Sequence, residues 1–405
     1  MIENKRTNNF LIALLLILSG DPAFYKQSWA PTGYAVIAVI LLFAYKKYIG
    51  KTFLKRFVIF ESVFLLIFVL QYFNLGSVPP NFILGFIIKG FIGALIFTVV
   101  GNNFSFAFYN VMYKICLISI PLFIVQLVWG DDVLSSIFLH EESRSIGIYT
   151  FRPKAAIESS VRNSALFWEP GAFQGYINLA LFANFHRMPY LIKNKKFSLV
   201  IIVLALISTL STTGYFVFAL LIAGYTLVYT KINKAFAVSI VTVFMILGSY
   251  LFFTLDFLGE KVESQYASAM ENEGEFNPER LGALLFDLHY IQKNPLTGNG
   301  FQPQTRYADH HALRDMEMRG ETLGHGNGFS NFIASAGIIG MLWYLIQIYR
   351  FQRTKINVRD PIFLILIIII LLQGEDFLRF PFFLAIAFFK PFTFKPIIFK
   401  PNNET

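Results

Sequence analysis

Long apolar runs alternate with short polar segments along most of the chain. A helix needs about 20 mostly apolar residues to cross the hydrocarbon core of a bilayer. We predict twelve such helices, at residues 9–20, 32–48, 57–74, 81–100, 106–130, 165–185, 197–211, 213–230, 235–254, 326–349, 360–374 and 378–394. The pattern therefore predicts an all-α polytopic membrane protein, in which residues 1–405 form a single integral membrane domain.

The charged residues support this topology. Lysines and arginines gather in alternate connecting segments, around residues 46–56, 187–196 and 350–359, where acids are rare. Such segments lie on the cytoplasmic side of membrane proteins. The pattern indicates an even number of spans with both termini in the cytoplasm. It also explains the net charge of +9 as topological charge spread over short loops, so no nucleic-acid partner is expected.

The composition agrees with a membrane protein. Hydrophobic residues make up 55% of the chain and charged residues 15%, which is too apolar for a soluble protein of this length. The single cysteine, Cys116, allows neither an intramolecular disulfide nor a cysteine metal cluster. The N-terminal stretch "MIENKRTNNFLIALLLILSG" lacks a small-residue cleavage site, so we expect it to remain as the first helix.

Two predicted outer segments are long, at residues 131–164 and 255–325, and long loops inside a compact domain are usually functional. Arginine is the dominant base on this side, and its guanidinium suits phosphate and carboxylate groups. In the second loop, Asn277 and the proline after it begin an amphipathic helix near 279–293. Arg280 lies in its first turn, where a cation opposes the helix dipole. We therefore expect an anionic ligand or an acidic partner beside it.

One span begins at the outer surface with charged groups. In "RNSALFWEPGAFQGYINLAL", the spacing places Glu169 at the N-cap of a helix that starts with a proline. Gly171, Gly175 and Asn178 then form a small and polar stripe on one face. Arg162 lies seven residues before Glu169 and could reach it, or an anion held beside it.

The span at 326–349 begins in a similar way. His325 stands at its outer mouth. Asn327, Asn331 and Ser335 follow at four-residue spacing, as one polar stripe that faces the bundle. The glycines that follow allow a neighbouring helix to approach closely. Two separate spans therefore direct polar and charged residues to the same level of the membrane.

Three charged residues remain inside the predicted spans, and such charges are functional candidates. Glu61 and Lys114 fall at a similar depth near the cytoplasmic side, so an ion pair between them is the simplest explanation. Lys89 has no evident partner in the sequence.

These features together resemble the O-antigen polymerase (Wzy) family and its relatives, the O-antigen ligases. The resemblance rests on the arginine before "LFWEPG", the "STTG" break between adjacent spans, "ER" leading into "NPLTGNG", and the histidine before "NGFSNFIASAGIIG". It covers about residues 162–345. Ligases usually carry serine-arginine-glycine at the break, whereas this chain has Ser211-Thr212-Thr213-Gly214. This departure favours the polymerase.

The resemblance implies a fold similar to the C-type glycosyltransferases, in the bacterial inner membrane, with the active site on the periplasmic face. It implies that the growing glycan passes from undecaprenyl diphosphate to the sugar of an incoming lipid-linked repeat unit. No cofactor, nucleotide sugar or metal is implied. The expected partners are the lipid-linked oligosaccharide, membrane lipids and a chain-length regulator protein.

The resemblance implies that Arg162 and Arg280 stabilise the diphosphate leaving group. His325 acts as general base or acceptor anchor, because histidine titrates near neutral pH. Glu169 is its rival as base, or the group that orients Arg162. The remaining candidates for substrate binding are the amides Asn327 and Asn331.

Two alternatives remain open. The protein could be an O-antigen ligase with lipid A–core as acceptor, or a flippase or transporter of the lipid-linked oligosaccharide. Transporters tend to show internal repeats and polar groups at the bilayer midplane. This chain shows no repeat, and its charged groups gather at the outer surface, which favours an enzyme.

His289 with Asp309, His310 and His311 fits no strong metal-ligand spacing, so no metal is expected.

Overall fold

The computed structural model describes residues 5–76, 78–130, 145, 147–151, 161–229, 239, 280–318, 326–352 and 359–388. Within these ranges the named elements are all helices, and the one β-type pairing is an isolated bridge between Ser145 and Thr150. The α-helices are α1 (Lys5–Gly20), α2 (Pro22–Tyr25), α3 (Ala30–Tyr45), α4 (Lys51–Leu75), α5 (Pro80–Val100), α6 (Phe104–Trp129), α8 (Pro170–Phe182), α9 (Met188–Asn194), α10 (Lys196–Ser208), α11 (Thr212–Tyr229), α14 (Arg280–Lys293), α15 (Pro303–Arg306), α16 (His311–Met318), α17 (Gly328–Gln352), α18 (Arg359–Leu372) and α19 (Pro381–Ile386). The predicted all-α class is confirmed for this part of the chain.

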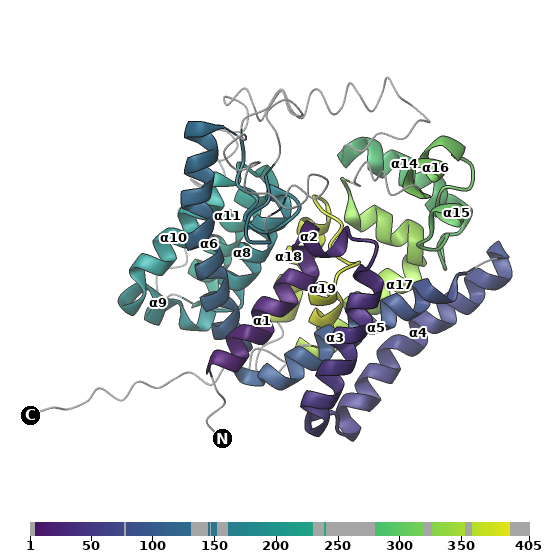
Figure 1. The fold of residues 1–405 in the computed structure, drawn as a ribbon, viewed down its shortest axis with the longest axis horizontal. Coiled ribbons are helices and arrows are strands. Elements are labelled where there is room, and N and C mark those ends of the chain that lie inside the picture. Colours follow the sequence, from purple (N-terminus) through teal and green to yellow (C-terminus); the bar gives the residue numbers. More distant parts are fainter. Residues whose placement is uncertain are drawn as a thin grey trace, which may run out of the picture.

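The helices form two groups around a central set (Figure 1). On one side lie α6, α8, α9, α10 and α11, and on the other lie α3, α4, α5 and α17. Between them run α1, α2, α18 and α19, and α19 packs closely on α5. The short helices α14, α15 and α16 gather beside the start of α17. The central set therefore places the α18–α19 connection between the two groups.

Three described helical runs are long and apolar enough to cross a bilayer, namely Ala30–Tyr48, Pro80–Trp129 and Gly328–Arg350. Pro80–Trp129 contains both α5 and α6, which a turn at Gly101 separates. Shorter apolar helices cover Lys196–Ser208, Thr212–Thr226 and Pro361–Leu372. The count of twelve spans stays a prediction, because 235–254 lies almost wholly outside the described residues and α19 covers only six residues of the span predicted at 378–394.

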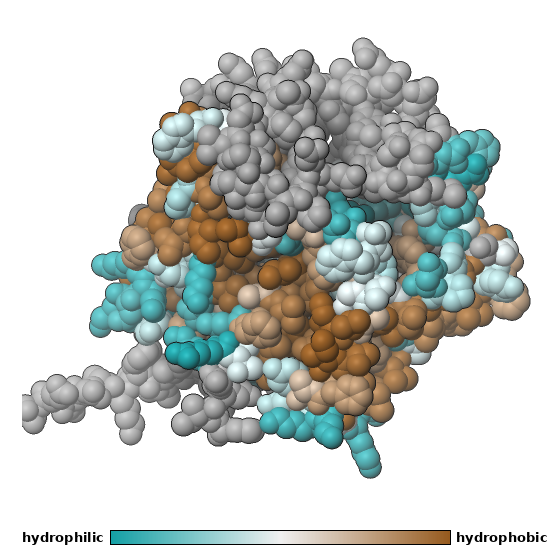
Figure 2. All heavy atoms as spheres, in the orientation of Figure 1, coloured by the Kyte–Doolittle hydropathy of each residue, from teal (hydrophilic) through white to brown (hydrophobic). Residues whose placement is uncertain are grey.

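The outward faces of the helices carry large apolar side chains. Phe43, Phe73 and Phe197 are 71%, 77% and 66% exposed, and hydrophobic atoms cover the middle of the view in Figure 2, with hydrophilic ones towards its edges. A soluble protein rarely exposes so large an apolar surface. In a bilayer the same surface faces lipid, which agrees with the predicted membrane protein.

Aromatic packing fixes the position of α19 against α5 and α6. The ring of Phe97 in α5 stacks on Phe104 in α6 with centroids 4.1 Å apart, and Phe382 of α19 lies against both rings. Gly93 of α5 faces the backbone carbonyl of Pro381, where any side chain would collide. The absence of a side chain at Gly93 therefore lets the start of α19 rest directly on α5.

The helix α17 is broken at Gly337, whose φ of 74° and ψ of 172° are not helical. The segment "NPLTGNG" that follows α14 enters this break. The backbone N–H of Ile338 donates to the carbonyl of Pro295 over 2.9 Å, and that of Gly300 donates to Ser335 over 3.0 Å. The sequence predicted a continuous helix here, with glycines that admit a neighbouring helix. The continuous helix is wrong, because the extended backbone of the loop is what approaches Gly337.

A side chain from α4 closes this break. Gln71 is fully buried, and its Nε2 donates to the carbonyls of Thr297 (2.6 Å) and Ser335 (2.8 Å). Gln71 thus supplies a donor to the Thr297 carbonyl, and a second donor to the Ser335 carbonyl, which also accepts from Gly300. An unpaired buried acceptor near the interrupted helix would be costly. The second outer segment is thus attached to α4 as well as to α17.

The predicted ion pair between Glu61 and Lys114 is wrong. Glu61 is 3% exposed and lies against Gly90 of α5, and its two carboxylate oxygens have no hydrogen-bond partner within the described part of the chain. Lys114 is exposed on α6. The two residues share a depth, but α4 packs on α5 and α17, whereas α6 packs on α1, α8 and α10.

Candidate functional site

The start of α8 has the geometry that the sequence predicted. Glu169 is the N-cap with an extended backbone, Pro170 begins the helix, and the Glu169 carboxylate makes no capping bond. Gly171 lies against the carboxylate of Glu375, and Gly175 lies against the ring of Phe377. Both glycines therefore allow the close approach that the sequence predicted. The segment that approaches α8 is the connection between α18 and α19.

The segment before α8 is not helical, although the span was predicted to begin at residue 165. Its residues 163–167 are buried, and Ala165 has a φ of 47°. The Arg162 Nε donates to the carbonyl of Thr209 over 2.9 Å, and the Asn163 N–H donates to Ser208. The segment is therefore attached to the end of α10. The reach of Arg162 to Glu169 stays a prediction.

The "STTG" break joins α10 to α11 by a tight turn in which Leu210 has a φ of 46°. The positive φ of a residue with a side chain is a strained conformation that tertiary contacts must maintain. Gly214 packs on the side chain of Gln174, and Asn178 Nδ2 donates to the Gly214 carbonyl over 3.1 Å. Asn178 and Gln174 thus face this break, whereas Gly171 and Gly175 of the predicted stripe face the α18–α19 connection.

The start of α17 is held by Asn327. Its Oδ1 accepts from the N–H of Ser330 (3.1 Å), and its Nδ2 donates to Oε1 of Gln373 (3.0 Å). Gly328 lies against the backbone of Glu375 and Asp376. The predicted substrate-binding residue Asn327 therefore caps its own helix and fastens it to the α18–α19 connection.

The α18–α19 connection is the meeting point of these contacts, and we call residues 373–380 the GEDFLR segment. Glu375 Oε2 accepts from the Trp168 indole over 2.8 Å. Asp376 Oδ2 accepts from Asn331 Nδ2 (3.1 Å) and lies 3.5 Å from the Arg379 Nε. The starts of α8 and α17, far apart in sequence, thus meet on this one segment.

Sequence reasoning missed the acids of the GEDFLR segment because it read these residues as a short link between two spans. A signal was present in "QGEDFLR", which places two acids and an arginine between apolar runs on the predicted outer side. Its importance depends on Trp168 and Asn331, and the sequence does not show that they lie nearby.

A buried ion pair joins the second outer segment to α17. Arg306 Nη2 contacts Asp287 Oδ1, and the two side chains are 2% and 0% exposed. Ser330 Oγ donates to Asp287 over 2.5 Å, and the Arg306 guanidinium approaches Asn331 Oδ1 at 3.4 Å. The guanidinium also lies 4.9 Å from the ring centroid of Tyr290. The network continues through Asn331 to Asp376 and so reaches the GEDFLR segment.

Two predicted site residues are not placed beside this network. Arg280 is the first residue of α14, and its side chain lies outside the described part. His325 lies outside the described residues altogether. Their roles stay predictions.

The histidines considered as metal ligands do not gather. His289 Nε2 lies 3.4 Å from Asp309 Oδ2, which also pairs with Lys293. Burial lowers the pKa of His310 below its usual value, and the charges of His289 and Lys293 lower it further. Within the described residues, no group of three potential ligands could hold a metal ion.

Charges converge on the hydroxyl of Tyr25, at the end of α2. Burial raises the pKa of this phenol above its usual value, and the nearby Arg379 lowers it. The carboxylates of Glu169, Glu375 and Asp21 raise it further. Tyr25 is therefore a neutral hydroxyl near pH 7, and the carboxylates around it outnumber the cations.

The intramembrane Lys89 also belongs to this region. Its Nζ lies 5.2 Å from the ring centroid of Tyr34, and the ammonium interacts electrostatically with Asp376 and Arg379. Lys89 lies one helical turn from Gly93, on the face of α5 that meets the start of α19. The cation without an evident partner in the sequence thus lies close to the GEDFLR segment.

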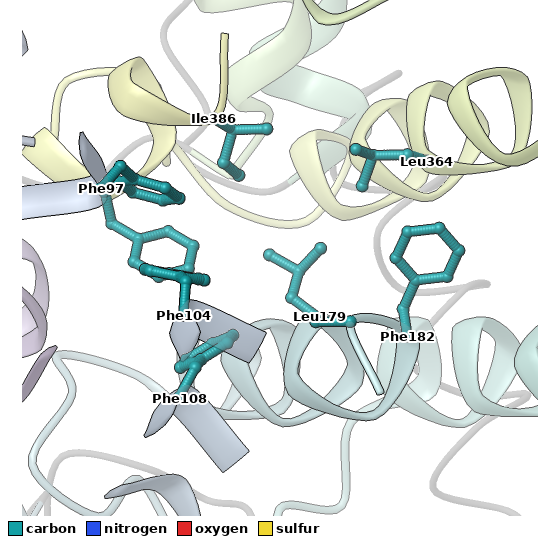
Figure 3. Close-up of a pocket in the computed structure, with 9 residues that line it drawn as sticks. Phe97, Phe104, Phe108, Leu179, Phe182, Leu364 and Ile386 are labelled. Atoms are coloured by element: carbon teal, nitrogen blue, oxygen red, sulfur yellow. The ribbon is translucent and has the colours of Figure 1, made fainter. Parts of the chain in front are cut away.

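A cavity inside the bundle has a different character. Figure 3 shows side chains from α5, α6, α8, α18 and α19 around it, and all of them are apolar. It offers no polar group for chemistry. The cavity is lined by Phe97, Phe104, Phe108, Leu179, Phe182, Ala183, Leu364, Phe382 and Ile386.

Comparison with known proteins agrees with this geometry. Residues 197–345 match the family model described as O-antigen ligase. The match supports the predicted resemblance to the O-antigen ligase/polymerase superfamily. The matched residues include the "STTG" break, α14, the buried ion pair and the broken α17. No curated protein matches the chain.

The match supports a glycosyltransferase-like function of the ligase or polymerase type in broad terms, and members of such families use lipid-linked glycans. The match does not distinguish a polymerase from a ligase. The choice between them must come from residues within the site.

Proposed function

We propose that the protein polymerises lipid-linked oligosaccharide repeat units at the outer face of the bacterial inner membrane. It transfers the growing glycan from undecaprenyl diphosphate to a sugar hydroxyl of an incoming lipid-linked unit. The bond from the glycan to the diphosphate breaks, a bond to the acceptor oxygen forms, and the acceptor proton passes to a base. The product is O-antigen or a related surface polysaccharide.

One observation carries this proposal. The starts of α8 and α17 both converge on the GEDFLR segment, within a chain whose residues 197–345 match the O-antigen ligase family model. A glycosyl transfer needs a leaving group, an acceptor and a base within one small volume. Polar groups gathered at one end of apolar helices suit a reaction between two lipid-anchored substrates.

The roles follow from charge. Arg162 and Arg280 stabilise the diphosphate as its negative charge develops, since donors aimed at that charge lower the barrier. His325 removes the acceptor proton, or Glu169 does so. Arg162 is half-buried at the "STTG" break, so its guanidinium is held rather than freely solvated.

A ligase is the second candidate, because the matched family is described as O-antigen ligase. Its chemistry would be the same, with lipid A–core as acceptor. We favour the polymerase because Thr212 and Thr213 occupy the break where ligases carry an arginine. Without that arginine, the position offers hydroxyls in place of a cation.

The first experiment is a gel of surface polysaccharide from a deletion strain, beside an analysis of its lipid-linked intermediates. We expect the ladder to collapse to a single repeat unit on the acceptor. Long chains that form on undecaprenyl diphosphate but never reach lipid A–core would identify a ligase instead. Single units that accumulate facing the cytoplasm would identify a flippase and remove the catalytic roles.

Lysine substitutions test the diphosphate role. Arg162→Lys and Arg280→Lys keep the positive charge but lose the planar guanidinium, which can donate hydrogen bonds to two oxygens at once. We expect polymer formation to fall about 100-fold at normal protein levels. Arg314→Lys is the matched control, because Arg314 pairs with the adjacent Asp315 on α16. Full activity in both lysine variants would contradict the role, and unchanged chain length in His325→Ala would remove that histidine from the site.

A further inference from the structure

Three aromatic rings form a cluster that includes the last residue of the GEDFLR segment, and we call Tyr25, Trp168 and Phe380 the aromatic platform. The rings of Trp168 and Phe380 stack with centroids 4.7 Å apart and an interplanar angle of 27°. Tyr25 meets Phe380 at 5.2 Å and Trp168 at 6.2 Å, both edge to face. The platform therefore combines α2, the approach to α8 and the end of the GEDFLR segment.

The platform is accessible from outside, unlike the hydrophobic core below it. Phe380 is buried at its base, whereas Tyr25 and Trp168 are half-buried. Arg379 beside them is 46% exposed, with its guanidinium 5.4 Å from the centroid of the Phe380 ring. Phe377 also contacts the Trp168 ring edge to face at 5.7 Å, and the Trp168 side chain stays partly exposed.

Polar groups surround these rings at fixed positions. Glu375 accepts the indole N–H of Trp168, which sets the orientation of both side chains. Glu169 follows Trp168 directly and makes no cap bond, and the hydroxyl of Tyr25 lies within the field of Glu169, Glu375 and Arg379. Such a site offers carboxylate acceptors, a guanidinium donor and a neutral hydroxyl around an aromatic face.

We propose that the aromatic platform, with Glu375 and Arg379, is the subsite that holds the acceptor sugar. A sugar ring has an apolar face that packs on an aromatic side chain, and hydroxyls that donate to carboxylates and accept from guanidinium. Amphipathic rings and charge-assisted hydrogen bonds supply both kinds of contact. The proposal rests on the proposed function, which requires an acceptor hydroxyl near the outer face.

The balance of charge favours a sugar over a diphosphate at this position. Asp21, Glu169, Glu375 and Asp376 bring four carboxylates near the platform, against the cations Arg379 and Lys89. An anionic diphosphate would be repelled by this excess, whereas a neutral polyol is not. The diphosphate then belongs nearer to Arg162, on the α10–α11 side of the GEDFLR segment.

The test measures binding of the free glycan to the full chain in lipid nanodiscs. The probe is the oligosaccharide released by mild acid from the lipid-linked glycan of the deletion strain, and the readout is saturation-transfer NMR. Arg379→Gln should weaken binding about tenfold or more, because it removes a charged hydrogen bond. Arg314→Gln on α16 is the matched control and should bind as the wild type does.

Tyr25→Phe removes a single hydroxyl from a half-buried ring and is the second variant, chosen because it should fold normally. We expect it to raise the KM for the acceptor with a smaller change in kcat. Wild-type affinity in both Arg379→Gln and Tyr25→Phe would overturn the subsite. A polysaccharide ladder that is unaffected by the deletion would instead overturn the proposed function, whatever the binding shows.

Discussion

Arg306 and Asp287 place two opposite charges in almost complete burial, in the predicted second outer segment. Neither charge could remain there alone, because removing a carboxylate or a guanidinium from water costs several kcal/mol. Ser330 and Asn331 supply further hydrogen bonds to the pair. At the scale of single residues, the arrangement explains how α14 and α15 keep a fixed position against α17.

Breaking the pair on one side should be costly. Arg306→Met leaves the Asp287 carboxylate buried without its cation, and we expect a loss of about 3–5 kcal/mol in the free energy of unfolding. The measurement is thermal unfolding of the purified protein in detergent. Arg314→Met, at a more exposed arginine, should change stability by about 0.5 kcal/mol or less.

The double variant Arg306→Met/Asp287→Leu shows whether charge burial is the cause. Apolar residues of similar volume can replace a buried ion pair with little loss. The double variant should therefore recover most of the stability that Arg306→Met loses. A double variant as unstable as the single one would show that the pair acts through packing instead.

The break in α17 decides the geometry at the scale of elements. Gly337 has a positive φ and faces the backbone of Leu296. The loop after α14 therefore packs in an extended conformation against the break in the helix. The hydrogen bonds from Ile338 and Gly300 replace helical ones that the break removes. The broken helix thus connects the outer segment with the bundle, and its first part carries Asn327 and Asn331.

A methyl group at the break should disturb this connection. Gly337→Ala would meet the Leu296 carbonyl and force a non-glycine residue into positive φ, which costs about 1–3 kcal/mol from the backbone alone. We expect a lower unfolding temperature and a lower amount of protein in membranes.

Gly85→Ala on α5 is the matched control for this variant. Gly85 lies in a helix with open space around its Cβ position, so alanine should stabilise it by about 0.5–1 kcal/mol. Equal behaviour of the two alanine variants would argue against the close approach at Gly337.

At the scale of the whole molecule, we call the GEDFLR segment and the polar groups that contact it the polar centre. The α18–α19 connection that carries it lies at one end of the central helices (Figure 1), and apolar side chains cover the middle of the view in Figure 2. The arrangement suits substrates that keep their lipid part in the bilayer and present their sugar outside. The orientation predicted from the basic residues places this centre on the periplasmic face.

Cysteine labelling tests that orientation. In a Cys116→Ser background, Lys26→Cys and Lys195→Cys place single thiols at exposed positions on the predicted outer and inner sides. A membrane-impermeant maleimide added to intact spheroplasts should label position 26 and leave position 195 unlabelled until the membrane is opened. The reverse pattern would invert the predicted topology.

The sequence by itself determined the features that depend on local pattern. Apolar runs predicted most of the helices, because a backbone in lipid must satisfy its hydrogen bonds internally. Glu169 and Pro170 predicted the start of α8, since the residues that begin a helix act through their immediate neighbours. The four motifs indicated the superfamily that the family match over residues 197–345 supports.

Only the tertiary structure decided which residues meet. Glu61 and Lys114 share a depth but lie on helices with different neighbours, which no one-dimensional pattern records. The GEDFLR segment gains its contacts from Trp168, Asn327 and Asn331, which are separated from it by 45 to 207 residues in the chain. A periodic pattern reports which face of a helix is buried. The identity of its partner depends on how all the helices pack together, so the polar centre could be recognised only in the folded molecule.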